Sequence, residues 1–306
     1  MCKTETRDPY AAYRDELVAA GLLIPLGPRG LYGRSGLFES IVDGFEGYIT
    51  RMGSDLAPEV MRFPPIFSRA TYELTDHISN FPDLMGSIHH FPGNERDHLR
   101  LLESFQQKED WGQKLSTSDL MLVPAACYPL YPTATGTLPE GGRRVDLKTF
   151  VFRHEPSDDP ARMQIFRQRE FVRLGSADDA YEHRNYWLAR GKEMLSSVGL
   201  NVTAVVANDP FFGRGGKVMK ATQLEQDLKF ELVVPICSSE KPTAVSSCNY
   251  HLDHFGVNFN IRTADGKPAH SACIGFGLER ITLALLKQHG FRLEKWPRDV
   301  LDLLSL

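Results

Sequence analysis

The sequence has little of what a secreted or membrane protein needs. Its 306 residues include five cysteines, an odd number at wide spacings with no Cys-x-x-Cys pair. A disulfide framework is therefore not expected in a chain of this size. No apolar run approaches the length that crosses a bilayer, and the first residues lack the apolar segment of a secretory leader. We expect a cytoplasmic protein without membrane contact.

The chain also lacks an excess of positive charge. Its formal net charge is −4, from 35 Lys and Arg against 39 Asp and Glu. A protein that grips nucleic acid through many phosphates carries a basic surface, which this composition does not indicate. Repeats and low-complexity tracts are missing, and no heptads are sustained before Leu37, so a coiled-coil arm is excluded there. We predict a single domain over residues 1–306, with residues 1–36 as an N-terminal extension.

What is present is a core-forming pattern. Apolar residues recur at steps of three and four from Phe38 to Met52, which predicts a helix that begins at Leu37 and ends at Gly53. Further helices are predicted at 67–80, 95–108, 178–198 and 278–289, and strands at 59–63, 120–126, 145–153, 164–174, 202–207, 228–236 and 257–262. From 145 onward the strands follow one another with short connections. This favours an α+β fold in which helices flank an antiparallel sheet.

One polar stretch carries candidate chemistry. Residues 150–175 read FVFRHEPSDDPARMQIFRQREFVRLG, a strand, a polar loop and a second strand. Arg153 and Glu155 are two residues apart and share one face, and the turn brings Phe166 near them. A guanidinium can grip phosphate oxygens, a carboxylate can accept from an amine, and a ring can stack on a base. The same residues could instead be a solvated ion pair above a core phenylalanine.

A second stretch, SACIGFGLERITLALL at 271–286, predicts a strand end, a Gly-x-Gly turn and an apolar helix. Arg280 places a permanent charge at the start of that helix, and Cys273 precedes the turn. Taken alone, Arg280 could be a surface arginine. The order of the motifs argues otherwise. Three elements follow one another along the chain: a strand ending at Pro64, then Phe-Arg-x-Glu with Arg162-x-x-x-Phe166, then Gly-x-Gly-x-Glu-Arg. In this order they resemble the three motifs of class II aminoacyl-tRNA synthetases.

This resemblance covers roughly residues 37–289, and AVSSCNYHLDHFGVNFNIR at 244–262 is similar to a seryl-tRNA synthetase core. It implies that Arg153 holds the α-phosphate of ATP and that Glu155 contacts the adenine edge or the α-amino group. Phe166 would stack on adenine, with Arg162 in the same ATP site. Arg280 would lie on the other side of the adenine or on the γ-phosphate.

Three departures from the synthetases bear on function. The long coiled coil that grips tRNA is missing, and the loop between Glu155 and Arg162 is shorter than the synthetase loop that contacts the acceptor stem. Ala244 stands near the position of an acidic Mg²⁺ ligand, so Glu231 becomes the candidate ligand for the Mg²⁺ that accompanies ATP.

The chain looks most like the amino acid:[carrier protein] ligases, bacterial homologues of a zinc-containing seryl-tRNA synthetase that lack its tRNA-binding domain. FRHEPSDDPARMQIFRQREFVRLG and NDPFFGRGGKVMKATQ carry this resemblance. It implies ATP-dependent activation of glycine or alanine as an adenylate and transfer to the phosphopantetheine thiol of a carrier protein. It also implies a homodimer formed through residues 37–65, and no tRNA partner.

The family's zinc ligands correspond to Cys127, Glu170 and Cys273 in this sequence. Two thiolates and a carboxylate leave a fourth tetrahedral position open for the substrate amine. The alternative is that the thiols are small buried hydrophobes, and Cys248 is a less favoured ligand candidate in the same region. Asp209 either orders a water or the amine near zinc, or is a turn acid before a proline.

Carrier proteins are generally acidic around their phosphopantetheine serine. We therefore expect the basic residues Arg214, Lys217 and Lys220 to contact the carrier, although a solvated helix face would look the same. Two other functions stay open. One is a truncated seryl-type synthetase that charges tRNA, and the other is an inactive regulatory paralogue, against which the retained Arg153 and Arg280 argue.

Overall fold

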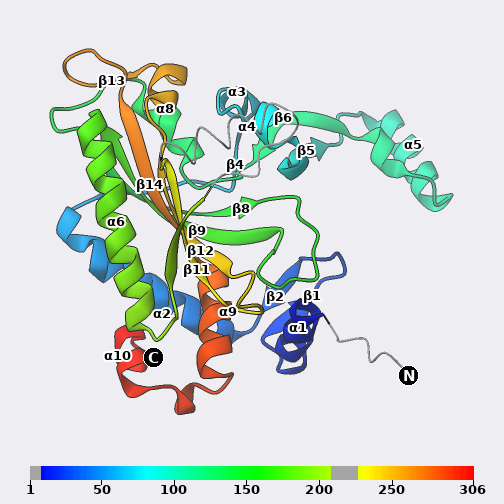
Figure 1. The fold of residues 1–306 in the computed structure, drawn as a ribbon. Helices are drawn as coiled ribbons and strands as arrows, with labels where there is room; N and C mark the ends of the chain where they lie inside the picture. Colours follow the sequence, from blue (N-terminus) through cyan, green and yellow to red (C-terminus); the bar gives the residue numbers. More distant parts are fainter. Residues whose placement is uncertain (1–7, 208–226) are drawn as a thin grey trace.

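A seven-stranded sheet forms the centre of the protein (Figure 1). The computed structural model describes residues 8–207 and 227–306. The strand order is β10-β11-β12-β14-β9-β8-β3, and neighbours run antiparallel except β3, which is parallel to β8. The strands are β3 (Glu59–Arg62), β8 (Arg143–Phe152), β9 (Ile165–Gly175), β10 (Thr203–Val206), β11 (Lys229–Val234), β12 (Thr243–Tyr250) and β14 (His270–Gly277). The predicted α+β class is confirmed, with one parallel pair at the edge.

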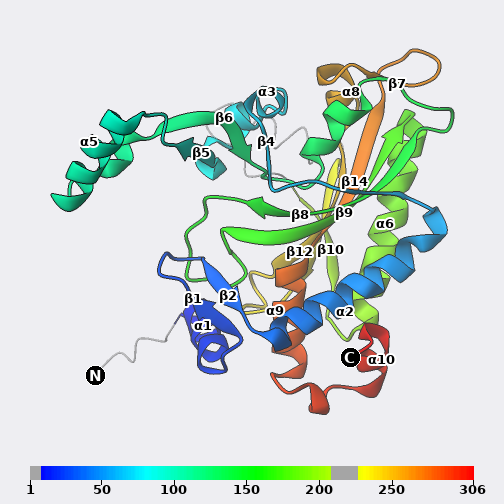
Figure 2. The ribbon, with the colours of Figure 1, turned by 180° about the vertical axis from the view of Figure 1, so that it is seen from behind.

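Long helices cover one face of this sheet. They are α2 (Gly36–Gly53), α6 (Ala177–Ser197) and α9 (Leu278–His289), and Figure 2 shows them together with α10 (Arg298–Leu304). Trp187 of α6 is fully buried and stacks on Phe171 of β9 at 4.4 Å between ring centroids. Gly53 ends α2 against the same Phe171 ring, where an added Cβ would lie 2.6 Å away. The helix stop predicted at Gly53 therefore also serves close packing.

Short elements cover the opposite face. They are η2 (Pro82–Leu84), α3 (Arg69–Glu73), α4 (His77–Asn80), η4 (Tyr128–Ala134), α8 (His254–Asn258), β7 (Gly136–Thr137) and β13 (Ile261–Arg262). The strand predicted at 257–262 is confirmed only at its end, as β13, because residues 257–258 belong to α8 and 259–260 form a turn. A helical turn lets Phe255 and Phe259, four residues apart, both pack on Tyr131, at 3.9 and 5.7 Å between ring centroids.

Two other predictions need correction. The helix predicted at 67–80 is divided into β4 (Ile66–Ser68), α3 and α4, because Asp76 adopts a left-handed backbone with φ of 56° between the two helices. The expected strand at 120–126 begins earlier, as β6 (Ser116–Leu122). Strands β4, β6 and β5 (Ser87–His90) form a second sheet, from which α5 (Glu95–Gln106) projects as an arm (Figures 1 and 2).

The N-terminal extension packs against the core. It contains α1 (Pro9–Ala19) and the hairpin of β1 (Leu23–Pro25) and β2 (Tyr32–Arg34). The buried Tyr13 hydroxyl donates to the carbonyl oxygen of Leu283 on α9 at 2.6 Å. The remaining short helical turns are η1 (Ser54–Leu56), η3 (Trp111–Lys114) and η5 (Leu293–Lys295). Within the described ranges, no helix is both long enough and apolar enough to cross a membrane.

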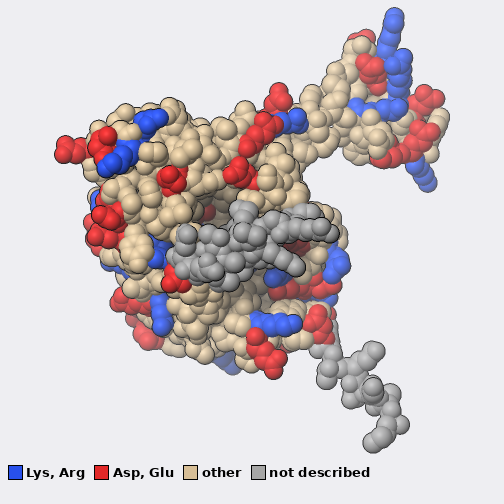
Figure 3. Space-filling view, turned by 45° about the horizontal axis from the view of Figure 1, so that its top comes forward, with Lys and Arg blue, Asp and Glu red and all other residues tan. Residues whose placement is uncertain are grey.

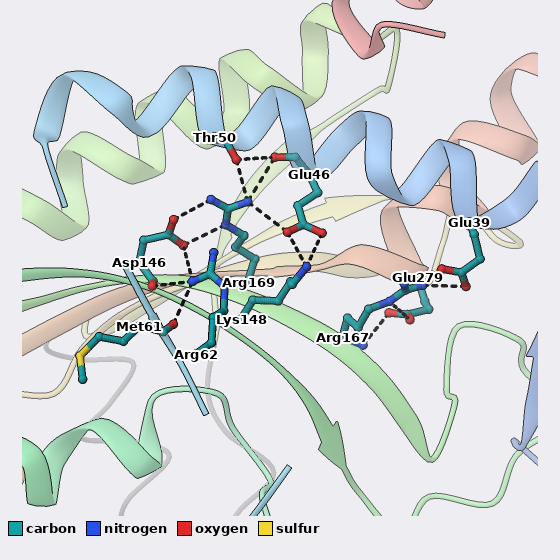
Figure 4. A network of polar contacts seen from close by, with 10 residues as sticks. All are labelled: Glu39, Glu46, Thr50, Met61, Arg62, Asp146, Lys148, Arg167, Arg169 and Glu279. Atoms are coloured by element: carbon teal, nitrogen blue, oxygen red, sulfur yellow. Dashed lines mark hydrogen bonds and ion pairs between the residues drawn. The ribbon is translucent and has the colours of Figure 1, made fainter. Parts of the chain in front are cut away.

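A buried ionic network ties the sheet to helix α2 (Figure 4). Arg169 of β9 is 2% exposed and makes two hydrogen bonds to the Asp146 carboxylate of β8, at 2.9 and 2.6 Å. Its third nitrogen donates to the Thr50 hydroxyl of α2 at 2.8 Å. Such a pair is costly to break on one side, because the remaining charge has no water to solvate it.

We expect Asp146→Asn to lower the free energy of unfolding by about 3 kcal/mol, because Arg169 would lose its two-bond buried counter-charge and keep only the longer ion pair with Glu46 at 3.4 Å. Urea unfolding of the two proteins measures the difference. The control is Asp302→Asn, which removes an exposed pair with Arg298 (2.9 Å) and should change stability by no more than about 0.5 kcal/mol. Equal effects of the two substitutions would contradict this account of the network.

Candidate active site

A cavity of about 550 Å³ opens on the sheet face opposite α2 and α6. Alternation along the central strands supplies its floor. On β9 the even-numbered Phe166, Gln168 and Glu170 face the cavity, while the odd-numbered residues face the helices. On the neighbouring strand β14, Cys273 and Gly275 face it. The cavity therefore lies over the middle of the sheet, where both neighbours hold each strand in place.

Two arginines flank one aromatic ring at one end of the cavity. The Cζ atom of Arg153 lies 5.6 Å from the centroid of the Phe166 ring, and Cζ of Arg280 lies 5.8 Å from it. Backbone carbonyls hold both cations. Arg153 Nε donates to Pro124 at 3.1 Å, and Arg280 donates to Ala161 at 2.7 Å and to Ala244 at 3.0 Å.

This end of the cavity is electrostatically suited to an anion. Within the described residues no carboxylate forms an ion pair with Arg153 or Arg280. Burial and the neighbouring cations Arg153 and Arg162 lower the pKa of Arg280 to about 10. A bound anion would relieve both the repulsion and the desolvation. Phosphate oxygens beside an aromatic ring are the ligand chemistry that this arrangement favours.

Of the other predicted nucleotide residues, Glu231 lines the cavity, whereas Glu155 and Arg162 are not among its lining residues. Arg162 donates to Glu155 at 3.1 Å and is about half exposed. Glu231 lines the cavity and forms an ion pair with Lys229 at 3.3 Å. Ala244 lines the cavity as well.

Two thiols and a carboxylate meet at a different part of the cavity. Cys127, Glu170 and Cys273 all line it and are each less than 5% exposed. Glu170 Oε1 accepts from the Ala126 backbone N–H at 3.1 Å, whereas Oε2 is buried without a hydrogen-bond partner in the described residues. A buried carboxylate oxygen without a donor is costly unless something else occupies its lone pairs.

Burial and mutual contact shift the pKa values of these groups. A hydrogen bond with Cys127 lowers the pKa of the Cys273 thiol well below its usual value, and His251 adds to this effect. The same hydrogen bond and burial raise the pKa of Cys127. Burial, followed by the charge of Cys273, raises the pKa of Glu170 to about 8. Each group therefore responds to the charge of its neighbours.

The arrangement of these side chains and their chemistry point in different directions. In the parts of the chain that it describes, no group of three or more His, Cys, Asp or Glu side chains is arranged to hold a metal ion. The chemistry of the donor set, two thiols and a carboxylate with one unpartnered oxygen, does fit zinc. Cys248 is separate from this set, because its side chain is buried in the main core and does not line the cavity.

Sequence reasoning missed several residues of the cavity. Gln168, Asn249 and His251 all line it. Asn249 Nδ2 lies 3.5 Å and His251 Nε2 3.7 Å from the sulfur of Cys273. The alternation from Phe166 could have revealed Gln168, whereas Asn249 needed the strand β12, which was not predicted. Four predicted residues, Asp209, Arg214, Lys217 and Lys220, lie outside the described residues.

Comparison with known proteins identifies the family, although no family model matches the chain. The chain is 42% identical over 291 residues to "Amino acid--[acyl-carrier-protein] ligase 1" of Bradyrhizobium diazoefficiens, covering 94% of this chain and 89% of that protein. It is 43% identical over 304 residues to ligase 2 of the same organism, covering 99% and 90%. A type-2 serine--tRNA ligase of Methanopyrus kandleri is 26% identical over 292 residues, and this match covers 54% of that protein.

Solved structures agree on the fold. The M. kandleri SerRS in complex with A. aeolicus tRNASec has a TM-score of 0.82 at 22% sequence identity, covering 96% of this chain and 60% of that one. The cytoplasmic serine-tRNA ligase of Naegleria fowleri in complex with AMP has a TM-score of 0.72 at 12% identity. These likenesses establish a class II synthetase-like core. With 42–43% identity to two ligases over most of their lengths, the chain belongs to the family of amino acid–[acyl-carrier-protein] ligases.

Proposed function

We propose that this protein activates glycine or alanine with ATP and Mg²⁺ and transfers the aminoacyl group to the phosphopantetheine thiol of a small acidic carrier protein. One observation carries the proposal. A single cavity holds two unneutralised arginines around an aromatic ring in one part and two thiols with a carboxylate in another. Nucleotide and amino acid would then meet between them. The two ligases at 42 and 43% identity are named for this type of reaction.

The nucleotide would lie at the arginine end. Phe166 would stack on adenine, and Arg280 would cover its other side or reach the γ-phosphate. Arg153 would hold the α-phosphate, and Glu155 would accept from the adenine amino group. Glu231 would serve the Mg²⁺ ion that accompanies ATP, since Ala244 carries no carboxylate. The cations would stabilise charge that grows on the phosphate oxygens in the transition state.

The reaction would proceed in two half-reactions. First, an amino acid carboxylate oxygen attacks the α-phosphorus, the bond to the bridging oxygen breaks, and pyrophosphate leaves. The product is an aminoacyl-adenylate. Second, the carrier thiol attacks the acyl carbon, a C–S bond forms, and the C–O bond to AMP breaks, while the thiol proton passes to water. The residues of the cavity act by holding the reacting groups in place rather than by forming a covalent intermediate.

Cys127, Glu170 and Cys273 would hold a zinc ion in the amino acid part of the cavity. When bound, zinc would supply a Lewis-acidic site that selects an unprotonated α-amino group. Asp209 would help to order the amine or a water there. Asn249 and His251 lie near the sulfur of Cys273 and would hold this sulfur in place for the zinc ion.

We also infer a homodimer formed through α2 and β3. In the described residues β3 is an edge strand that pairs only with β8, and its Val60 side chain is 63% exposed. An edge strand with an exposed apolar side chain is a template for pairing with another chain. The residues concerned are those of the first class II motif.

The acceptor is proposed to be a carrier protein rather than a tRNA. On the face shown in Figure 3, Lys and Arg side chains are interspersed with Asp and Glu. A tRNA would need many phosphate contacts on a basic surface. A small acidic carrier would need fewer cations, and Arg214, Lys217 and Lys220 would supply them.

Arg280→Gln should reduce kcat/KM for ATP about a hundredfold in amino acid-dependent ATP–pyrophosphate exchange, because charged hydrogen bonds contribute about 1.5–3 kcal/mol. The wild-type protein should give exchange with glycine or alanine among the twenty amino acids. Arg292→Gln, an exposed arginine paired with Glu294, is the control and should leave exchange unchanged. An absence of exchange with every amino acid would favour the inactive regulatory paralogue.

Purified protein should contain about one zinc ion per chain, and Cys127→Ser and Cys273→Ser should each lose it, because each removes one of three protein ligands. Metal analysis and the thiolate absorption of the cobalt-substituted protein measure this directly. Cys248→Ser is the matched control, since this thiol is equally buried outside the cavity. Retention of zinc in both ligand variants would contradict the proposed ligand set.

Lys217→Glu combined with Lys220→Glu should slow aminoacyl transfer to the carrier at least about tenfold at low salt while leaving pyrophosphate exchange intact, because rim charges mainly raise the association rate. Transfer of a radiolabelled amino acid is measured with carrier and with tRNA as acceptors. Lys267→Glu, far along the chain and paired with Asp265, is the control. Equal loss of both half-reactions would refute this placement, and labelling of tRNA would refute the proposed acceptor.

A further inference from the structure

The loop that joins β8 to β9 has the proposed nucleotide site on one side and the N-terminal extension on the other. On its inner side, Arg280 donates to the carbonyl oxygen of Ala161, and Arg162 donates to Glu155. The loop also leads directly into Phe166. The outer side is held by residues 8–35, to which the reaction described above assigns no role.

Two arginines of the extension converge on one loop carboxylate. Arg14 of α1 donates to Oδ1 of Asp158, and Arg29 from the turn between β1 and β2 donates to Oδ2 at 2.6 Å. The two cations come from different elements and approach different oxygens of the same side chain. An exposed ion pair by itself contributes little, but two pairs from separate elements fix the direction of the carboxylate and hence of the loop.

The same turn also grips the far end of the loop through its backbone. The backbone N–H of Gln164 donates to the carbonyl oxygen of Gly30 at 2.8 Å. The Gln164 side-chain amide donates to the backbone carbonyl oxygen of Arg29 at 2.7 Å. Gly30 has a φ of 74°, and a Cβ there would lie 3.1 Å from the carbonyl oxygen of Arg162. Glycine thus permits both the left-handed turn and the close approach.

Apolar packing joins the extension and the loop into one unit. Ala161 and Met163 are 4% and 3% exposed and belong to the same core cluster as Tyr13 and Leu17 of α1. The loop is therefore fixed at its end by burial and in its middle by Asp158. Hydrogen bonds of Asp159 to Ser157 and Ala161 shape the turn inside the loop. Asp158, whose side chain is 40% exposed, makes the ion pairs that join the middle of the loop to the extension.

We propose that Arg14 and Arg29 are positioning residues for ATP, which act through Asp158 to keep the β8–β9 loop in its nucleotide-binding conformation. This rests on the proposed function, because it concerns the same nucleotide site. If the loop samples other conformations, the apparent affinity for ATP falls by the fraction of molecules in the competent one. Chemistry within the assembled complex stays the same, and the amino acid site around Cys273 is not touched by the loop.

Asp158→Asn should raise KM for ATP about threefold to tenfold in pyrophosphate exchange, with kcat and the KM for the amino acid unchanged. Asp158→Glu should restore most of the ATP affinity. Arg14→Gln combined with Arg29→Gln should match Asp158→Asn, and adding Asp158→Asn to this pair should have no further effect, because all three act through one contact. Direct binding measurements should rank the variants by ATP affinity in the same order. Hydrogen exchange of residues 153–165 should be faster in the variants that bind ATP more weakly.

The matched control is Asp55→Asn. Asp55 is another partly exposed carboxylate that bridges two side chains, Tyr186 and Arg190, on a different part of the surface. It should change neither ATP binding nor loop exchange. An unaltered KM for ATP and unaltered loop exchange in Asp158→Asn, with an active wild type, would overturn this inference alone.

A parallel fall in kcat and in thermal stability would make the contact merely structural and would also overturn the inference. Failure of the proposed function looks different. In that case the wild-type protein would bind no ATP and show no exchange, whatever stands at position 158.

Discussion

Strand β9 lies between β14 and β8, and its strict alternation organises both faces of the protein. Its odd-numbered residues turn toward the helices, where Arg167 and Arg169 pair with buried carboxylates and Phe171 packs on α6. Its even-numbered residues turn toward the cavity, where Phe166 lies beside the two arginines and Glu170 beside the two thiols. A shift of one residue in register would exchange the two sets and destroy both faces.

The two faces are also coupled at one point. Glu279 is almost fully buried and accepts from the backbone and side chain of Arg167, at 2.7 and 2.8 Å (Figure 4). Glu279 and Arg167 directly adjoin Arg280 and Phe166 in the chain. The ion pair on the helix face therefore sets the relative positions of Phe166 and Arg280, which both line the cavity. Arg167 also donates to the carboxylate of Glu39 in α2, so the same arginine joins β9 to this helix as well.

The cavity itself combines charges that would be unfavourable if nothing bound there. Arg153 and Arg280 stand close to one ring without a carboxylate partner among the described residues, and Glu170 has a buried oxygen without a donor. Burial of the large apolar core between the sheet and helices α2, α6 and α9 offsets the unfavourable free energy of these buried charges. Such local exceptions in an otherwise well-satisfied structure are typical of ligand sites.

The sequence by itself determined the fold class, through the order and spacing of its predicted elements, and the family, through the resemblance that its ordered motifs carry. It also determined helices such as α2 and α9, whose apolar faces repeat over several turns. The split of 67–80 at Asp76, the helical turn at Phe255 and the strand β12 needed the tertiary structure, since packing against distant partners outweighs weak local preference there. Likewise, only the folded chain brings Arg14 and Arg29 to Asp158, because about 130 residues or more separate the partners and no local pattern encodes such a contact.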